Sequence, residues 1–285
     1  MSKKIKIYCI GLIIREIVNP FYAGIVRGME EYLNKNNLNY SLVLSDMIQK
    51  EESSEKYIDT FLERRVDGIA TTSDKISLDY LKYLKKINLP IVFIGRYIDS
   101  PGIDVNYITI DDYKGAYLIS EYLIKLGHKN IACVTASINA KNVLNRLAGY
   151  KSALKKYGMK ICRENIVSGD ELSTESGFEA AKKLLSYKNK PTAIFCSNDF
   201  SAFGVIDYCI KRGIKVPEDV SIAGFDDVSF SSLDFVSLTT VKQPINKMGK
   251  IAAEVLINKI ETKSKETVKM VIKPETTIRK STRAL

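Results

Sequence analysis

Four stretches of polar residues stand directly after runs of apolar residues in this chain. They are residues 15–22, 95–96, 198–199 and 226–227. Guanidinium groups donate hydrogen bonds, carboxylates accept them and amides do both, so these side chains can hold a small polar molecule. In open parallel sheets, ligands bind where the loops that follow the strands converge. These stretches are therefore the candidate binding residues.

Residues suited to catalysis or to metal binding are scarce. His128 is the only histidine, which removes the Ser/His/Asp arrangement and most histidine-based metal sites. Glycine-rich nucleotide motifs and the H-E-x-x-H zinc motif do not occur. Adjacent Asp226 and Asp227 at the end of a strand would point to different sides and would not flank one bond. We expect a binding protein that is not an enzyme, with no cofactor and no metal.

The elements that would position these residues alternate between short apolar runs and longer stretches of helical period. This is the pattern of repeated β-α units on a parallel sheet. Asn19 can cap the first helix, and Pro20 fits its first turn. The first series predicts strands at residues 5–14, 40–44, 68–71 and 91–94, and helices at residues 21–33, 52–64 and 78–87.

A second series of similar size follows. Residues 111–112 can cap its first helix, and Asp199 is expected to cap the helix that starts at residue 200, which leaves Asn198 for a ligand. The series predicts helices at residues 113–126, 143–156, 176–185 and 200–211, and strands at 131–135, 166–167, 193–196 and 221–225. After residues 239–241 it predicts one more helix with its apolar face at 248–260 and a late strand around 268–272.

These elements predict an α/β fold of two Rossmann-like lobes, each a parallel sheet flanked by helices and joined to the other by crossovers. A chain of 285 residues is long enough for two such cores. We expect residues 1–110 and 243–271 in the N-terminal lobe, and residues 111–242 and 272–285 in the C-terminal lobe. The ligand cleft is expected between the two lobes.

Composition narrows the setting of the protein. The formal charge of +10 fits a nucleic-acid binder, but the lysines are spread along the whole chain and do not mark a DNA-binding face. Five cysteines at wide spacings indicate reduced thiols in the cytoplasm. No apolar run is long enough to span a bilayer, and the N-terminal apolar stretch alternates like a strand and lacks the cleavage site of an export signal.

Several motifs, in order along the chain, resemble the LacI/GalR family of transcription regulators. Individually they are weak, but their common order makes the resemblance specific. They are residues 19–22 (NPFY), 65–69 (RVDGI), 126–132 (LGHKNIA), 146–150 (RLAGY), 191–195 (PTAIF), 198–199 (ND), 216–222 (VPEDVSI), 224–227 (GFDD), 238–241 (LTTV), 243–244 (QP) and 279–282 (RKST).

The resemblance implies the effector-binding core of such a regulator, with a type I periplasmic-binding-protein-like fold. It also implies a homodimer whose state of lobe closure is passed to an N-terminal helix-turn-helix headpiece that binds operator DNA. Met1 stands just before the first expected strand, so this DNA-binding domain is expected to be absent from the chain, and we expect that it was trimmed away. Whether effector strengthens or releases DNA binding, and whether dimers form tetramers, stays open.

Matched by position, the resemblance implies six ligand-binding residues. Such a set suits a sugar or similar polyol, because guanidinium, carboxylate and amide groups pair with hydroxyls and an aromatic face covers the apolar side of a ring. Gly95 stands where some sugar-binding relatives use Asp, so the carboxylate that contacts ligand hydroxyls there is missing. Arg96 is expected to compensate for it. The six residues are Arg146, Asn198, Asp226 and Gln243, with Tyr22 and Phe21 at the mouth of the site.

Each of these residues also has a purely structural alternative. Arg146 can pair with a carboxylate, Asp226 can cap its own loop, and the two aromatics can belong to a helix core. At the level of the whole protein, the main alternative is the sugar-binding component of a transport system, which would share the fold and the cleft. The gene sequence before residue 1 separates these functions, since a regulator requires a helix-turn-helix there and a transport component requires an export signal.

Overall fold

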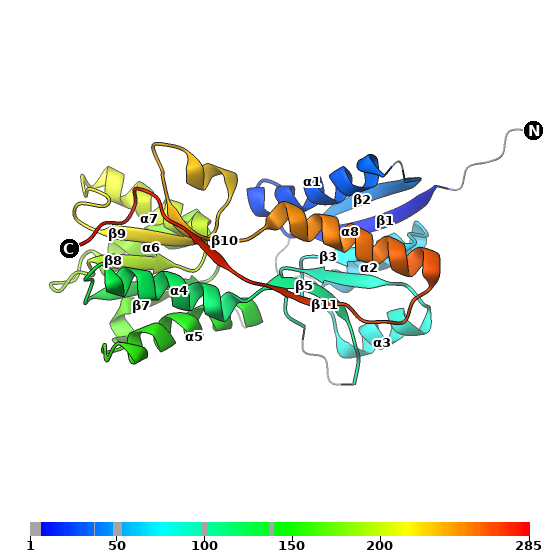
Figure 1. Ribbon diagram of the computed structural model, residues 1–285, viewed down its shortest axis with the longest axis horizontal. Coiled ribbons are helices and arrows are strands. Elements are labelled where there is room, and N and C mark those ends of the chain that lie inside the picture. The colour runs from blue at the N-terminus through cyan, green and yellow to red at the C-terminus, as the bar shows by residue number, and fades with distance from the viewer. Residues whose placement is uncertain (1–6, 37, 48–52, 99–101, 137–139) are drawn as a thin grey trace, which may run out of the picture. The chain divides into compact units, whose positions relative to one another are not determined.

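A computed structural model describes residues 7–36, 38–47, 53–98, 102–136 and 140–285 (Figure 1). The chain forms two compact units, each assembled from two separate segments. Unit 1 holds Met1–Thr109 and Pro244–Ile272, and unit 2 holds Ile110–Gln243 and Lys273–Leu285. Each unit has its own sheet and its own helices.

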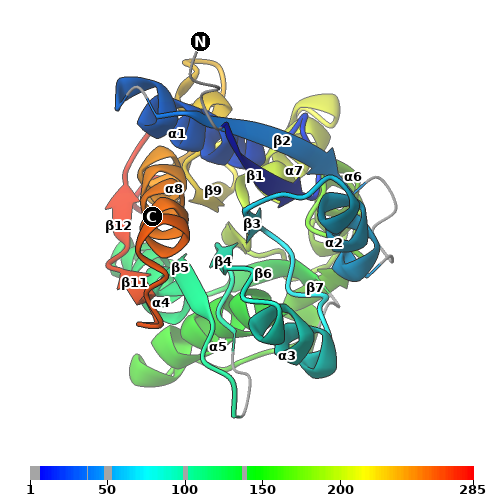
Figure 2. The same ribbon diagram turned by 90° about the vertical axis from the view of Figure 1, so that its right-hand side faces the viewer.

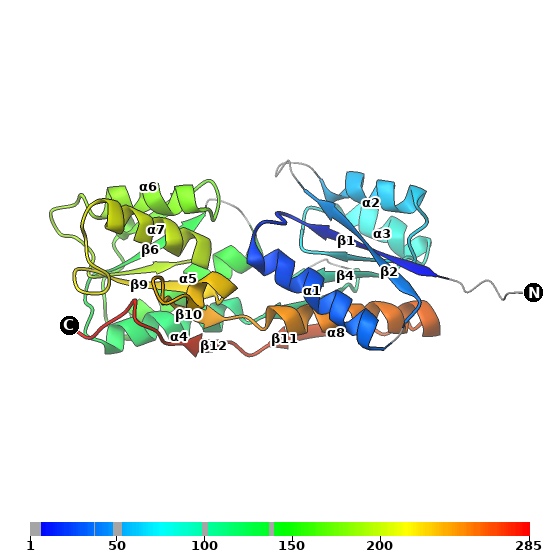
Figure 3. The same ribbon diagram turned by 90° about the horizontal axis from the view of Figure 1, so that it is seen from above.

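Unit 1 is built on a six-stranded sheet in the order β11-β5-β4-β3-β1-β2, in which β1 to β5 pair in parallel. Helices α2 and α3 lie on one face of the sheet, and α1 and α8 lie on the other (Figure 3). The elements are β1 (Tyr8–Ile14), α1 (Pro20–Lys35), β2 (Tyr40–Asp46), α2 (Ser54–Glu63), β3 (Gly68–Thr71), α3 (Leu78–Lys86), β4 (Ile91–Ile94), β5 (Asn106–Ile110), α8 (Ile245–Thr262) and β11 (Lys269–Ile272).

Burial explains why the central strands of unit 1 are apolar almost throughout. Strands β3 and β4 are buried at every position, as expected for parallel strands covered on both faces. Phe61 of α2 and Leu81 of α3 belong to the core on one face. On the other face α1 packs against α8, and an end-on view shows these two helices side by side (Figure 2).

Unit 2 repeats this plan in the order β12-β10-β9-β8-β6-β7, with β12 antiparallel to β10 and the other pairs parallel. Helix α4 pairs with α5 on one face, and α6 pairs with α7 on the other. The elements are α4 (Asp112–Lys125), β6 (Ile131–Ala136), α5 (Lys141–Lys156), β7 (Ile166–Gly169), α6 (Thr174–Leu184), β8 (Ala193–Cys196), α7 (Asp199–Lys211), β9 (Ser221–Asp226), β10 (Thr239–Lys242) and β12 (Glu275–Thr277), with short 3-10 turns at Arg163–Asn165 and Ser229–Ser232.

The α/β prediction with two parallel-sheet lobes is confirmed, and the expected helices and strands are present with ends shifted by a few residues. Asn19 caps α1 through its side chain, with Pro20 in the first turn. The predicted strand residues 5 and 6 and the predicted helix residue 52 lie outside the described residues. Strands β5, β10 and β12 were not among the predicted strands.

Each sheet has one position at which the chain, after adding strands toward one edge of the sheet, begins to add them toward the other edge. In unit 1 this position lies between β1 and β3, and in unit 2 it lies between β6 and β8. Loops that leave the carboxyl ends of these strands turn to opposite faces, which opens a crevice where ligands bind in folds of this kind. The candidate residues of each unit are therefore expected at this edge.

Candidate ligand-binding site

Arg146 lies at the centre of the carboxyl edge of unit 2. Its Nε donates to Asp112 Oδ1 at 2.7 Å, and its Nη1 donates to the carbonyl oxygen of Ser197 at 2.7 Å. The guanidinium group stands 3.8 Å from the ring centroid of Phe225, a stacking contact that suits its flat delocalised charge. Helix α5 thus carries Arg146 over the end of β8, and the side chain is almost fully buried.

Asp226 and Gln243 form a second pair at this edge. Gln243 Nε2 donates to Asp226 Oδ1 at 2.7 Å, and Arg146 Nη1 donates to the same oxygen at 3.3 Å. The backbone N–H of Gln243 also donates to the carbonyl oxygen of Asp226, at 3.1 Å. Three of the predicted residues, from α5 and from the ends of β9 and β10, therefore meet in one hydrogen-bonded group.

The backbone at Asp226 is in a conformation that side chains rarely adopt. Its φ is 128°, and that of Asp227 is 56°. Such angles cost free energy and are found where the surrounding structure fixes a side chain for function. At Asp226 the turn directs the carboxylate toward Arg146, while Asp227 turns to Arg279, whose Nη2 lies 2.7 Å from Asp227 Oδ1. The two adjacent carboxylates thus engage different partners, as the sequence predicts.

Burial raises the pKa of Asp226 to about 7. Removal from water disfavours the charged carboxylate, the positive charge of Arg146 partly opposes this effect, and the nearby Asp199 adds to the increase in pKa. The protonation of Asp226 is therefore sensitive to pH near neutrality.

The residue that caps α7 is not the predicted one. Asn198, not Asp199, is the N-cap of α7, because its Oδ1 accepts from the backbone N–H of Ser201 at 2.9 Å. Its Nδ2 donates to the carbonyl oxygen of Leu172 at 3.0 Å. Asn198 stands at the predicted edge, but its amide already makes two bonds within the unit. The expectation that Asp199 frees Asn198 from capping was wrong.

Asp199 is instead a fully buried acceptor that joins three segments of unit 2. It accepts from the hydroxyls of Ser231 and Thr240, each at 2.6 Å, and from the backbone N–H of Val228 at 3.0 Å. Burial raises the pKa of Asp199, and these hydrogen bonds oppose the shift. The sequence shows an acidic residue at the start of α7, but its partners lie 29 to 41 residues further along the chain and could not be inferred from spacing.

Further polar atoms at this edge are buried and have no hydrogen-bond partner among the described residues. They are Gln243 Oε1, Asn142 Oδ1 and Thr135 Oγ1. Buried polar atoms are nearly always paired, so an unpaired group at a strand edge indicates a place for water or a ligand. Sequence reasoning missed Asn142 and Thr135. Asn142 stands four residues before Arg146, on the same face of α5, and this spacing was the available signal.

The candidate residues of unit 1 also gather at the carboxyl edge of its sheet. Phe21 and Tyr22 open α1, with their ring centroids 5.2 Å apart in an edge-to-face arrangement. Gly95 has a φ of 68°, and a Cβ added there would come within 3.2 Å of the ring of Phe21. Arg96 is buried, and its Nε donates to the carbonyl oxygen of Thr72 at 2.8 Å. Part of the donor capacity of Arg96 is thus used inside unit 1.

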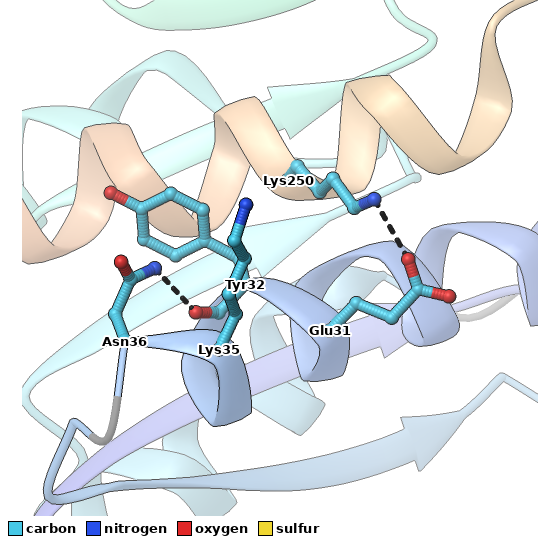
Figure 4. A pocket seen from close by; sticks show the side chains of 5 residues that line it. All are labelled: Glu31, Tyr32, Lys35, Asn36 and Lys250. Carbon is cyan, nitrogen blue, oxygen red and sulfur yellow. Dashed lines mark hydrogen bonds and ion pairs between the residues drawn. The ribbon is translucent and has the colours of Figure 1, made fainter.

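A hollow of about 450 Å³ lies elsewhere in unit 1, over the contact of α1 with α8 (Figure 4). Lys250 Nζ pairs with Glu31 at 2.8 Å, and Asn36 Nδ2 donates to the carbonyl oxygen of Tyr32 at 2.7 Å. The ion pair joins α1 to α8, and Asn36 lies at the C-terminal end of α1. The lining residues are Glu31, Tyr32, Lys35, Asn36 and Lys250, none of which is a predicted ligand residue.

Other kinds of site find no support in the part of the chain that the structure describes. There, no three His, Cys, Asp or Glu side chains are grouped so that they could hold a metal ion. In the same residues, no helix combines the length and the apolar character that crossing a membrane requires.

The family described as "Periplasmic binding proteins and sugar binding domain of LacI family" matches residues 8–281. The fold, the strand-edge residues and this match agree, and the chain belongs to the LacI family as its effector-binding domain. The resemblance seen in the sequence is thereby confirmed.

Named relatives and solved structures fit the same class. The chain is 32% identical to the HTH-type transcriptional repressor PurR of Photobacterium profundum, over 97% of this chain and 81% of that protein. It is 35% identical to the HTH-type transcriptional regulator DegA of Bacillus subtilis, with the same coverage. A LacI family transcriptional regulator from Enterococcus faecium with bound ribose superposes with a TM-score of 0.86 and 29% identity, over 97% of this chain and 99% of the other.

Proposed function

We propose that this domain binds a small polar effector, most simply a sugar, through the carboxyl edge of unit 2, and that binding changes the affinity of the full-length regulator for operator DNA. The observation that carries the proposal is the buried Asp226–Gln243 pair, which keeps one amide oxygen without a partner at a strand edge suited to ligands. The structural relative with bound ribose supports a sugar.

The contacts give each residue a definite part in the proposal. Arg146 uses Nε and Nη1 within the unit and fixes Asp226, which leaves Nη2 as its main group for a ligand. Asp226 and Gln243 accept from ligand hydroxyls, and Asn198 borders the site from the start of α7. The contribution of Phe21 and Tyr22 stays a prediction, with an aromatic surface as its physical basis.

Isothermal titration calorimetry against sugars, polyols, purines and nucleosides tests this assignment. We expect Asp226→Asn and Gln243→Ala each to weaken binding by about tenfold or more, because a hydrogen bond to the charged Asp226 contributes roughly 1.5–3 kcal/mol and a buried ligand donor that loses its Gln243 acceptor costs roughly 1–3 kcal/mol. Asp234→Asn is the matched control, since the side chain of Asp234 is 99% exposed. Unchanged affinity in both site variants would show that the ligand binds elsewhere.

Regulation requires two states that the effector binds with different affinity. A coupling of about 1–3 kcal/mol is sufficient, and it must act in both directions. In the full-length protein, effector is expected to shift operator binding, measured by fluorescence anisotropy, and operator DNA is expected to shift effector binding by the same factor. Operator affinity that does not respond to a bound effector would favour the alternative of a sugar-binding transport component.

We also propose a homodimer in the cytoplasm, without catalytic activity. The relatives named above are transcriptional regulators, and all five cysteines are free thiols, as expected in a reducing compartment. Light scattering during size exclusion tests the dimer, and a monomer at micromolar concentration would contradict it.

A further inference from the structure

The buried edge of unit 2 holds more negative than positive groups. Asp112, Asp199 and Asp226 are each no more than 8% exposed, and the cation that contacts two of them is Arg146. The charged groups that act most strongly on Asp226 are Arg146 of α5, Asp199 of α7 and Asp112 of α4. Above about pH 7, where Asp226 has lost its proton, the formal charge of this group is negative.

The single cation of this group is already committed to partners within the unit. Arg146 contacts Asp112 at 2.7 Å and Asp226 at 3.3 Å, and it also donates to the carbonyl oxygen of Ser197. A guanidinium group that binds an anionic ligand presents two parallel N–H groups to it. Here Nε and Nη1 of Arg146 are already engaged, so an anionic ligand that takes such a fork would compete with Asp112, Asp226 and the carbonyl oxygen of Ser197 for the same N–H groups.

Apart from the donor Nη2 of Arg146, the edge offers acceptors to a ligand. Gln243 Oε1 and Asn142 Oδ1 are buried acceptors that have no partner among the described residues, and each belongs to a side chain no more than 6% exposed. Thr135 Oγ1 is a hydroxyl that can donate or accept. Gln243 is linked directly to the carboxylate group through Asp226. Ligand atoms that lie against Gln243 Oε1 and Asn142 Oδ1 must therefore be hydrogen-bond donors.

We propose that this edge selects an uncharged or cationic ligand rich in hydrogen-bond donors, such as a neutral or amino sugar, and rejects carboxylate and phosphate groups. The inference rests on the proposed function, because it takes this edge as the effector site. An anionic group would have to be held by residues outside the edge. Like charges placed together in a buried site repel each other strongly.

Matched sugars of different charge test the inference on the full chain. Glucose, glucosamine, glucuronate and glucose 6-phosphate share one ring, and ribose and ribose 5-phosphate share another. Calorimetry at constant ionic strength is expected to show the neutral or amino form of a sugar binding at least about tenfold more tightly than its acidic or phosphorylated form. Tighter binding of the acidic or phosphorylated form would overturn the inference.

Two variants separate the failure of this inference from the failure of the proposed function. Asn142→Lys adds a cation to the edge and is expected to narrow the preference against the acidic sugar. If the wild type prefers an anionic sugar and Asp226→Asn changes its affinity, the site stands and the charge preference is wrong. If a neutral sugar binds and its affinity is unchanged in Asp226→Asn and Asn142→Lys, the proposed site is wrong.

If no sugar of the panel binds, that result contradicts a sugar effector. The charge preference of the edge is then tested with inorganic phosphate, through its effect on the Tm. A Tm that rises no more in phosphate than in sodium chloride of equal ionic strength supports the preference. A specific rise that disappears in Gln243→Glu, which adds a further negative charge, would overturn it.

Discussion

Arg146 links helix α5 to carboxylates from two other elements, Asp112 at the start of α4 and Asp226 at the end of β9. Replacing a whole buried ion pair with apolar residues often costs little stability. Removing only one partner, in contrast, leaves an uncompensated charge in a medium of low polarity. The same residue therefore supports the fold of unit 2 and the position of the proposed binding groups.

Arg146→Ala is expected to lower the free energy of unfolding by about 3–5 kcal/mol, because Asp112 and Asp226 would remain buried without their cation. Urea denaturation followed by circular dichroism measures this. Lys182→Ala is the control, since Lys182 pairs with Glu179 on the surface, with both side chains more than half exposed, and it should cost at most about 1 kcal/mol. Equal losses in the two variants would contradict a structural role for Arg146.

Asp226 should make the stability of unit 2 depend on pH. Its pKa is raised by burial to about 7 in the folded chain, so between about pH 4 and 7 the folded state binds a proton that the unfolded state does not. Its contribution to stability is present at low pH and is lost as pH rises through about 7. Between about pH 5 and 8, the free energy of unfolding of the wild type should fall relative to that of Asp226→Asn, measured in urea. Parallel pH profiles would show that Asp226 does not titrate as described.

The sequence predicted at this scale which residues stand at the strand edges, but not how they pair. Arg146, Asp226 and Gln243 meet in one group, although they are up to 97 positions apart in the sequence. The capping roles of Asn198 and Asp199 could not be assigned, because both residue types cap helices well and the choice depends on Ser231 and Thr240, which are distant in the chain.

At the scale of elements, glycine decides how closely α1 and α8 approach. A Cβ at Gly28 would collide with the backbone carbonyl of Asn246, and a Cβ at Gly249 would collide with that of Ile25. These glycines stand on facing surfaces of two helices more than two hundred residues apart. Their small size is what allows the backbones to touch.

Gly28→Ala should destabilise unit 1 by about 1–3 kcal/mol, because the added methyl group meets backbone that cannot rotate away. Gly24→Ala on the same helix is the matched control, since its Cβ would meet Cγ2 of the Ile245 side chain and no backbone atom within 4 Å. Thermal unfolding of the two variants compares them, and a lower Tm for Gly24→Ala than for Gly28→Ala would contradict the argument.

Strands covered on both faces were predicted with their ends, whereas the sequence pattern did not show β5 and β12. Strands β3, β4 and β8 are short buried runs whose ends match the sequence pattern. Strand β12 (Glu275–Thr277) is three polar residues that pair only along β10, so its sequence carries no apolar period. Strand β5 contains Asn106, whose side chain donates to the carbonyl oxygen of Ile91, a contact that a local pattern does not show.

At the scale of the whole molecule, the five thiols are free and most of them are shielded. Cys133, Cys196 and Cys209 are buried, while Cys9 and Cys162 are partly exposed. Burial raises the pKa of Cys133 and of Cys209 to about 12 in each case, so reactive thiolate is rare at these positions.

A thiol reagent such as DTNB should therefore modify Cys9 and Cys162 in the folded protein, and the other three only after unfolding. Mass spectrometry of the labelled peptides assigns the sites. The Tm should be the same with and without reductant, because no disulfide contributes to stability. Rapid labelling of Cys133 in the native protein would contradict the burial described here.

The division of each unit between two segments has a consequence for synthesis. Helix α8 and strand β11 complete unit 1, yet they leave the ribosome after Gln243, when almost all of unit 2 has already emerged. Domains usually fold in order from the N-terminus as the chain is made, but here the first unit must wait for residue 272 and the second for the segment that follows it. Both cores are therefore finished almost together, only after residue 272 has been made, so the surface of α1 that α8 will cover stays open to chaperones until then.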